Sequence, residues 1–245
     1  MDAKKDQRLM VDNQVIESIV GHARPSKNET VLEVGAGNGH LTVELAELAG
    51  RVFAVEKDRE LCAVLRERVK RFGNVEVLEG DALKMELPAC DKVVSNVPYS
   101  ISRKITVMLL EHGFQEAFLL YQREFALKLT APPGEGNYRF ITALVQSTCD
   151  ILLLMDVPAS AFRPQPRVAS KLVMLSQRNR PDKEYVSFLR ELFNHKNKNL
   201  CNILGDMSDD LTAGWASRKP VDMKPDELVE LYAFVSGKTV NGKKA

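Results

Sequence analysis

The chain is expected to be an α/β protein, with a Rossmann-like, largely parallel sheet followed by a small helical domain. Short apolar runs alternate with helical segments through the first 120 residues, a rhythm typical of βαβ units in an open parallel sheet. A glycine-rich turn containing Gly35 and Gly37 comes directly after the first apolar run. From about Pro181 onward the pattern changes to short helices. These three observations together predict the fold class.

The expected elements of the sheet domain follow in chain order. Residues 13–22 repeat with a helical period, which predicts an amphipathic helix before the sheet. Buried strands are then expected over residues 30–34, 51–55, 75–78, 92–94 and 117–120. Helices are expected between them over residues 41–48, 60–72 and 101–112.

The alternation stops at residues 131–136, which form a loop by their proline and glycine content. Two later apolar runs, residues 151–155 and 171–175, are expected to pair antiparallel across a proline-rich segment. Short helices are expected over residues 184–194, 198–204 and 225–235. The pattern therefore predicts a sheet domain over residues 1–179, a helical domain over 180–236 and a disordered tail over 237–245.

Composition and length are typical of a soluble globular protein. The 245 residues are 44% hydrophobic, and no stretch approaches the roughly 18 apolar residues of a membrane span. The charged N-terminus is not followed by a signal-type apolar core, so we expect a cytoplasmic protein without membrane contact. The four cysteines are scattered singly, which predicts reduced thiols and no bound metal.

Local charge, rather than the net charge of +1, suggests a nucleic-acid surface. Between Arg163 and Leu200 there are nine basic and three acidic residues. The phosphate contacts expected there are Arg163, Arg167, Lys196 and Lys198. Charge alone equally suits a solvated helical face, which is the more common role of such a run.

Three successive strands end in positions that suit a nucleotide-like cofactor. Gly35 and Gly37 allow a tight turn and a close approach of backbone to ligand. Glu56, which ends the second strand 21 residues past Gly35, can accept ribose hydroxyls. These features would also suit NAD, but Asp81, followed by Ala82 after the third strand, is placed to receive the adenine amino group of S-adenosylmethionine. Separately, each position could be structural, as a turn, a helix N-terminal charge or a cap.

The tetrapeptide Asn96-Val97-Pro98-Tyr99 follows the fourth strand and suits methylation of an exocyclic amine. The Asn96 side-chain oxygen and the Val97 carbonyl can each accept one N–H bond, which aims the lone pair of the amine at a methyl donor. Pro98 stiffens the turn, and Tyr99 offers a flat face on which a base can stack. The alternative is an ordinary turn between a strand and a helix.

Five segments spread over nearly the whole chain match one known family. They are residues 6–12, 33–37, 96–102, 122–126 and 162–170. The last segment is the most discriminating, because it is similar to the family's Phe-x-Pro-x-Pro-x-Val-x-Ser. With these segments the chain resembles the small-subunit ribosomal RNA adenine-N6 dimethyltransferases (KsgA type), especially their compact archaeal members, and an archaeal source is favoured.

The resemblance implies a class I S-adenosylmethionine-dependent methyltransferase that dimethylates two adjacent adenosines in the 3′-terminal hairpin loop of small-subunit (16S) rRNA. The substrate would be a pre-30S particle in ribosome biogenesis, and the enzyme a monomer that does not bind DNA. Residues 1–179 would be the catalytic domain and 180–236 would bind RNA. The cofactor contacts would be Arg8, Met10, Gly35, Gly37, Glu56, Asp81, Ala82 and Asn96. The target amine would meet Asn96, Val97, Pro98 and Tyr99.

The last matching segment suggests a second wall for the target base. A base flipped out of an RNA loop needs both faces covered, and Phe162, held by Pro164 and Pro166, could stack opposite Tyr99. The alternative for Phe162 is a core aromatic that closes the edge of the sheet.

Departures from the family pattern leave other functions open. Asp6 stands in place of the family's Gly, and Arg8 and Leu9 replace a polar-aromatic pair, so the cofactor lid is altered. One alternative is therefore a catalytically weak ribosome-assembly or RNA-binding factor. Another is a large-subunit rRNA adenine-N6 methyltransferase, which shares the Asn-x-Pro-Tyr architecture. DNA adenine methylation is disfavoured, since the chain is too short for a domain that reads sequence.

Overall fold

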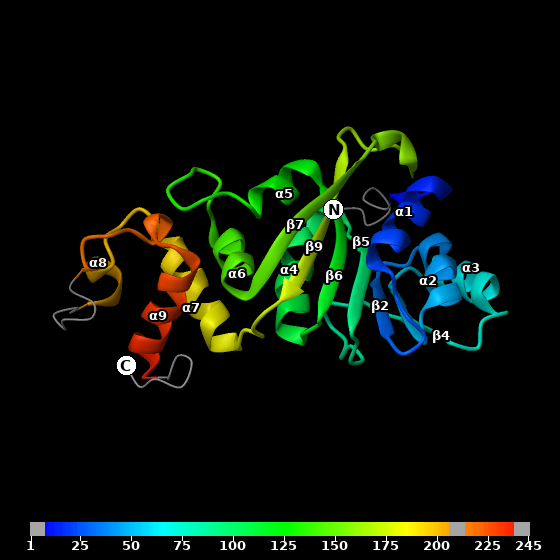
Figure 1. Cartoon of the computed structure of the whole chain (residues 1–245), viewed down its shortest axis with the longest axis horizontal. Coiled ribbons are helices and arrows are strands. Elements are labelled where there is room, and N and C mark those ends of the chain that lie inside the picture. Colours follow the sequence, from blue (N-terminus) through cyan, green and yellow to red (C-terminus); the bar gives the residue numbers. More distant parts are fainter. Residues whose placement is uncertain (1–7, 206–213, 238–245) are drawn as a thin grey trace. The chain divides into compact units, whose positions relative to one another are not determined.

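The computed structural model describes residues 8–205 and 214–237. Asp6 and most of the predicted tail lie outside the described residues. Figure 1 shows the chain coloured along its sequence. The chain divides into two compact units, of which the first contains the described residues up to Leu127 together with Asp150–Arg178. The second unit contains Lys128–Cys149 and the described residues from Asn179 onward.

A seven-stranded sheet with the order β4-β3-β2-β5-β6-β9-β7 forms the centre of the first unit. The strands are β2 (Thr30–Val34), β3 (Arg51–Glu56), β4 (Val75–Glu79), β5 (Lys92–Asn96), β6 (Glu116–Gln122), β7 (Cys149–Val157) and β9 (Ser170–Gln177). The pairs from β4 to β6 are parallel, and β9 is antiparallel to β6. The strands that cover the two late apolar runs, β7 and β9, are neighbours, as predicted. This sheet confirms the α/β prediction.

A second, two-stranded sheet joins the N-terminal segment to residues 162–170, the last segment that matches the family. Strands β1 (Leu9–Met10) and β8 (Phe162–Arg163) pair antiparallel. Val11 N also donates to Ala161 O at 2.9 Å. Neither strand has the length or alternation that would identify it in the sequence.

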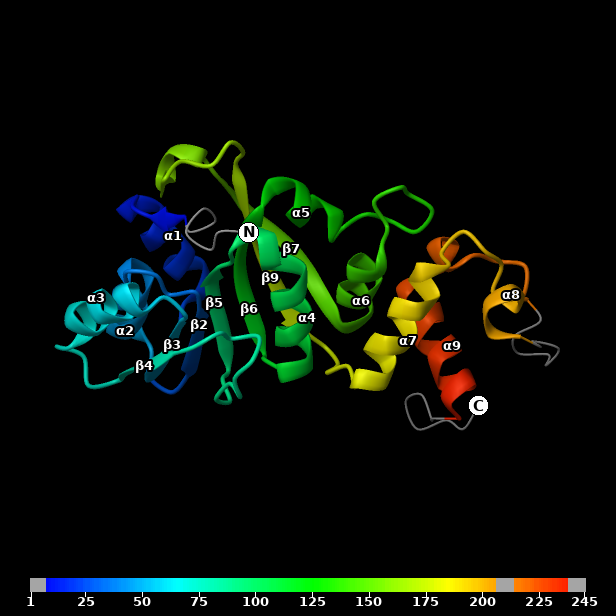
Figure 2. The same ribbon diagram turned by 180° about the vertical axis from the view of Figure 1, so that it is seen from behind.

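Helices cover both faces of the main sheet. Those of the first unit are α1 (Asn13–Ala23), α2 (His40–Leu48), α3 (Arg59–Val69), α4 (Ser102–His112) and α5 (Arg123–Lys128, whose last residue belongs to the second unit). Helix α4 lies in front of the strands in Figure 2, on the face opposite α1 and α2. The predicted helices before and within the βαβ series are thereby confirmed, whereas α5 was not predicted.

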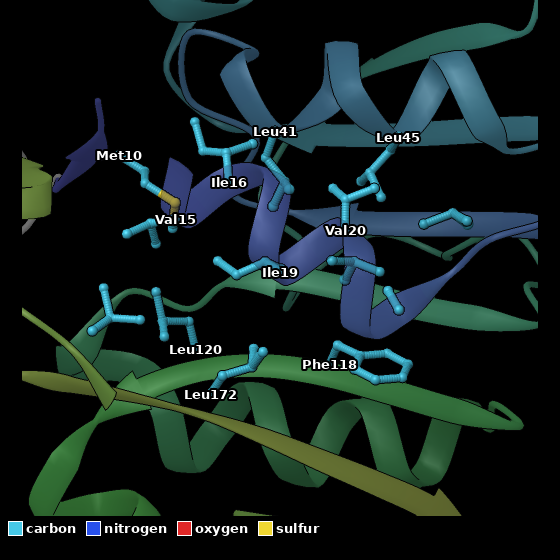
Figure 3. Close-up of a cluster of buried hydrophobic side chains, with 14 of the residues drawn as sticks. Met10, Val15, Ile16, Ile19, Val20, Leu41, Leu45, Phe118, Leu120 and Leu172 are labelled. Carbon is cyan, nitrogen blue, oxygen red and sulfur yellow. The ribbon is translucent and has the colours of Figure 1, made fainter. Parts of the chain in front are cut away.

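Helix α1 closes one face of the sheet through the apolar stripe predicted from its period. Asp12 caps it by accepting from Gln14 N and Val15 N at 3.0 and 3.2 Å. Figure 3 shows Ile19 and Val20 of α1 between α2 and strand β6. Burial of each such side chain stabilises the fold by about 1.5–3 kcal/mol, so the stripe fixes α1 beside the sheet edge that carries the glycine turn.

The second unit is helical, with α6 (Phe140–Thr148), α7 (Lys183–Asn194), α8 (Cys201–Leu204) and α9 (Pro225–Ser236). Helix α6 belongs to it because Tyr138 donates to Met223 O at 3.0 Å and Tyr185 donates to Ser147 Oγ at 2.9 Å. The predicted boundary at 179/180 placed this segment in the sheet domain. Periodicity indicates that α6 is buried, but it does not indicate that α7 and α9 are its partners.

Within residues 8–205 and 214–237, no helix combines the length and hydropathy needed to cross a bilayer. In the same residues, no three His, Cys, Asp or Glu side chains are grouped so that they could hold a metal ion.

Candidate active site

A cavity of about 510 Å³ lies at the carboxyl ends of the parallel strands in the first unit. This edge is where ligands bind in open α/β sheets. Most of the predicted cofactor and amine contacts line it: Arg8, Gly35, Gly37, Glu56, Asp81, Ala82, Asn96, Val97, Pro98 and Tyr99. The structure therefore brings together residues that the sequence spreads over more than 90 positions.

The glycine turn is fixed by backbone bonds to the neighbouring strand. Gly35 N and Ala36 N donate to Val55 O at 2.8 and 3.1 Å. Gly35 and Gly37 have φ of 77° and 59°, a region that glycine enters without steric cost. A Cβ at Gly37 would lie 2.8 Å from Leu9 Cδ2, so a larger residue would have to displace the Leu9 side chain as well as adopt a strained φ.

Glu56 is buried at the end of β3, and its carboxylate accepts three backbone N–H groups. Oε2 accepts from Gly37 N at 2.8 Å, and Oε1 accepts from Lys57 N and Asp58 N, both at 2.9 Å. The carboxylate thus ties the glycine turn to β3. Oε2 keeps one lone pair for a further donor.

Asp81 lies in the turn after β4. Its Oδ1 accepts from Leu83 N at 3.0 Å, which fixes the carboxylate beside the cavity. Ala82 is buried next to it. A carboxylate held in this way can accept from an amino group.

The Asn96 side chain is oriented by Arg8, the residue just before β1. Its Nδ2 donates to Arg8 O at 2.8 Å, so Oδ1 is the atom that can accept from a substrate amine. Val97 is buried and donates its N–H to Leu120 O at 3.2 Å. The tetrapeptide is therefore bonded to β6 on one side and to Arg8, just before β1, on the other.

Two of the predicted site residues lie in the core instead. Phe162 has no accessible surface and packs with α1 residues in the main hydrophobic cluster. A side chain without accessible surface cannot stack on a base, so the expected wall opposite Tyr99 is corrected to a core position. The Met10 side chain is also buried in this cluster, and its O lies 2.8 Å from His40 Nδ1. The family pattern identifies the positions of both residues, but it does not indicate the direction of their side chains.

Arg8 lines the cavity with a partly unsatisfied guanidinium. Nη1 donates to Pro164 O at 3.3 Å, whereas the buried Nε has no partner among the described residues. Several apolar and polar lining residues were not predicted: Leu9, Val34, Val55, Lys57, Leu61, Ile101 and Ile105. Most of them adjoin a predicted residue in sequence, and this adjacency is the signal that could have identified them.

The predicted RNA contacts are at the surface of their respective units. Arg163 and Arg167 are exposed on the first unit, and Arg163 Nη1 donates to Phe162 O at 3.0 Å. On the second unit, Lys196 is half-buried and Lys198 is exposed just after α7. All four are accessible to a phosphate.

A protonatable carboxyl lies beneath the glycine turn. Glu33 is buried in β2, and Thr42 Oγ1 donates to its Oε2 at 2.6 Å. Burial, helped by the nearby charge of Glu56, raises the pKa of Glu33 to about 8, although the hydrogen bond from Thr42 opposes the shift. Sequence analysis assigned no role to this residue.

The sheet order, the glycine turn and the acidic residues after β3 and β4 define a class I S-adenosylmethionine-dependent methyltransferase fold. The family model described as ribosomal RNA adenine dimethylase matches residues 3–230. The chain therefore belongs to the ribosomal RNA adenine dimethylase family. This confirms the resemblance stated above and the predicted reaction class, methyl transfer to adenine of ribosomal RNA.

Relatives and solved structures agree with this assignment. A probable ribosomal RNA small subunit methyltransferase A of Methanosarcina mazei is 37% identical, over 94% of this chain and 91% of its own length. The corresponding protein of Pyrococcus abyssi is 40% identical, over 78% and 71%.

Among solved structures, a dimethyladenosine transferase of Plasmodium falciparum superposes with a TM-score of 0.79 at 26% identity, covering 91% of this chain and 95% of its own. The 23S rRNA methyltransferase ErmE superposes with a TM-score of 0.68 at 24% identity, covering 93% and 99%, and shows the shared fold alone.

Proposed function

We propose that the cavity binds S-adenosylmethionine between the glycine turn and the tetrapeptide. The fit rests on the chemistry of the donor set. Gly35 and Gly37 present backbone, Oε2 of Glu56 can accept a ribose hydroxyl, and Asp81 can accept an adenine amine. The unpartnered Nε of Arg8 is a donor for an anionic group such as the methionyl carboxylate. When bound, the cofactor supplies an activated methyl on a sulfonium.

The tetrapeptide would hold the target adenine for in-line transfer. Asn96 Oδ1 and the Val97 carbonyl accept the two amine hydrogens, so that the nitrogen lone pair is directed away from them. Tyr99 supports the plane of the base. Orientation of this kind is the main contribution that protein groups make when the methyl is already activated. No general base is required of the protein, because the product proton can leave to solvent.

The substrate we propose is a pair of adjacent adenosines in the 3′-terminal hairpin loop of small-subunit rRNA, each methylated twice. The enzyme would act as a cytoplasmic monomer on a pre-30S particle. Arg163 and Arg167 on the first unit, and Lys196 and Lys198 on the second, would contact RNA phosphates. The printed names of the small-subunit relatives support this choice of subunit.

One observation carries the proposal: Asn96, Glu56 and Asp81, from three different strand ends, line one cavity. The test is transfer of labelled methyl from S-adenosylmethionine to unmethylated 30S particles, followed by nuclease digestion and mass analysis of the nucleosides. N6,N6-dimethyladenosine from the 3′ hairpin is the expected product. Tight particle binding without transfer would indicate an assembly factor instead, and dimethyladenosine from 50S particles alone would indicate the large-subunit reaction.

A further inference from the structure

The Tyr99 hydroxyl is held by a residue outside the cavity. Oη of Tyr99 and Oγ of Ser170 are 2.5 Å apart. Tyr99 lines the cavity, whereas Ser170 is fully buried and is absent from the lining. The serine hydroxyl can therefore influence a bound base only through the tyrosine.

Ser170 is part of the same rigid framework as Asn96. It is the first residue of β9 and pairs with Gln122 at the end of β6. Strand β6 in turn pairs with β5, where Asn96 lies opposite Leu120. Three adjacent strands thus fix the position of the Ser170 hydroxyl relative to the amide that would hold the target amine.

The backbone end of Tyr99 is fixed as well. It opens a short 3₁₀ helix, Tyr99–Ile101. Ile101 N donates to Pro98 O at 3.2 Å, and Ser102 Oγ donates to Tyr99 O at 3.1 Å. The hydroxyl bond to Ser170 restrains the two side-chain torsions of Tyr99, which the backbone bonds by themselves do not restrain.

We propose that Ser170 is a positioning residue, which sets the plane of the Tyr99 ring so that a stacked adenine presents its amine to Asn96 through both methyl transfers. The inference rests on the proposed role of Tyr99 in holding the base. It concerns the second transfer most strongly, because the monomethylated amine has one N–H left to donate, so its orientation depends more on the ring that supports the base. A loosely held ring would release more monomethylated product.

The role of Ser170 also explains how residues 162–170, the last segment that matches the family, contribute to the site. Its first residue, Phe162, is anchored in the core, and its last, Ser170, holds a cavity residue. The segment between them carries the exposed Arg163 and Arg167. Ser170 thus links this segment to the reaction, and Phe162 anchors the segment in the core.

The test is a double-mutant cycle with Ser170→Ala and Tyr99→Phe, which remove the two sides of one hydrogen bond. We expect each single variant to lower kcat about 10-fold through loss of orientation and to raise the ratio of N6-methyladenosine to N6,N6-dimethyladenosine. The double variant should be no slower than either single variant. The affinity for S-adenosylhomocysteine, measured by calorimetry, should not change, because Ser170 does not line the cavity.

A matched control comes from the second unit, where the buried Ser147 accepts from the Tyr185 hydroxyl at 2.9 Å. Ser147→Ala removes the same kind of bond away from the cavity. It should lower the unfolding temperature and leave kcat and the product ratio unchanged. Comparison of the two alanine variants separates orientation of the base from general stability.

Three outcomes would overturn the inference. Effects of Ser170→Ala and Tyr99→Phe that multiply in the double variant would show that they act separately. A Ser170→Ala variant that behaves like Ser147→Ala would make Ser170 a residue of the fold only. If Ser170→Ala does not fold, Tyr99→Phe decides alone, and a normal kcat and product ratio would refute the idea. By contrast, absence of methyl transfer by the unaltered protein would refute the proposed function itself.

Discussion

The Asn96→Ala substitution removes both hydrogen bonds that this side chain can make, and the loss of each is expected in a different measurement. The substitution removes Oδ1, the proposed acceptor of the target amine, and it removes the 2.8 Å bond from Nδ2 to Arg8 O. Loss of one group that hydrogen-bonds in the transition state costs about 10²- to 10³-fold in kcat, or roughly 2.7–4 kcal/mol. Loss of the bond to Arg8 costs about 0.5–1.5 kcal/mol of folding stability. The kinetic effect should therefore exceed the effect on stability.

The assay is single-turnover methyl transfer to unmethylated 30S particles, with urea unfolding measured on the same preparations. Asn74→Ala is a matched control, because Asn74 Nδ2 donates to Ala46 O and Ala49 O at 2.9 and 3.0 Å and lines no part of the cavity. It should lower stability without slowing transfer by folded protein. Near-normal turnover by Asn96→Ala would refute the role of Asn96 as acceptor of the target amine. Equal kinetic losses in both variants would show that the slower transfer results from lowered stability.

Three further predictions concern the cofactor turn, the core and the buried carboxyl. Glu56→Ala should weaken S-adenosylhomocysteine binding at least about 10-fold, since it frees Gly37 and removes a charged acceptor; calorimetry that shows unchanged affinity would contradict the ribose role. Phe162→Ala should lower unfolding free energy by about 3–5 kcal/mol and leave methyl transfer per folded molecule intact. Weakened RNA methylation without loss of stability would instead indicate that the Phe162 ring contacts the target base. For Glu33, the folded-state pKa of about 8 exceeds the ordinary glutamate value of 4.5, so the folded state holds the extra proton and stability should fall as pH rises between these values. Glu33→Gln should flatten that slope in urea unfolding measured from pH 5 to 8, and an unchanged slope would show that another group titrates.

The sequence alone was sufficient to predict the parts of the site that lie at strand ends. Gly35, Glu56 and Asn96 each follow a strong apolar run, and parallel strands bring their carboxyl ends to one edge. The positions of these three residues in the cavity therefore follow from the βαβ rhythm alone. The same rhythm places β2, β3 and β5 within a residue or two of their observed bounds.

Side-chain direction and non-local pairing could not be predicted in this way. Phe162 lies in a strand of two residues, too short for alternation to show which face is buried. Its burial results from pairing with β1, which is more than 150 positions away in the chain. The assignment of α6 to the second unit likewise depends on partners such as Met223 that are distant in sequence.

The bond between Asn96 and Arg8 spans 88 residues, and the bond between Arg8 and Pro164 spans 156. Strand β1 is synthesised long before β8, its pairing partner, which is among the last parts of the first unit to be made. During synthesis, therefore, the glycine turn and the tetrapeptide can form well before the segment that orients Asn96 has a partner. The pairing of β1 with β8 therefore completes the support of Asn96 only after most of the strands of the sheet have been made.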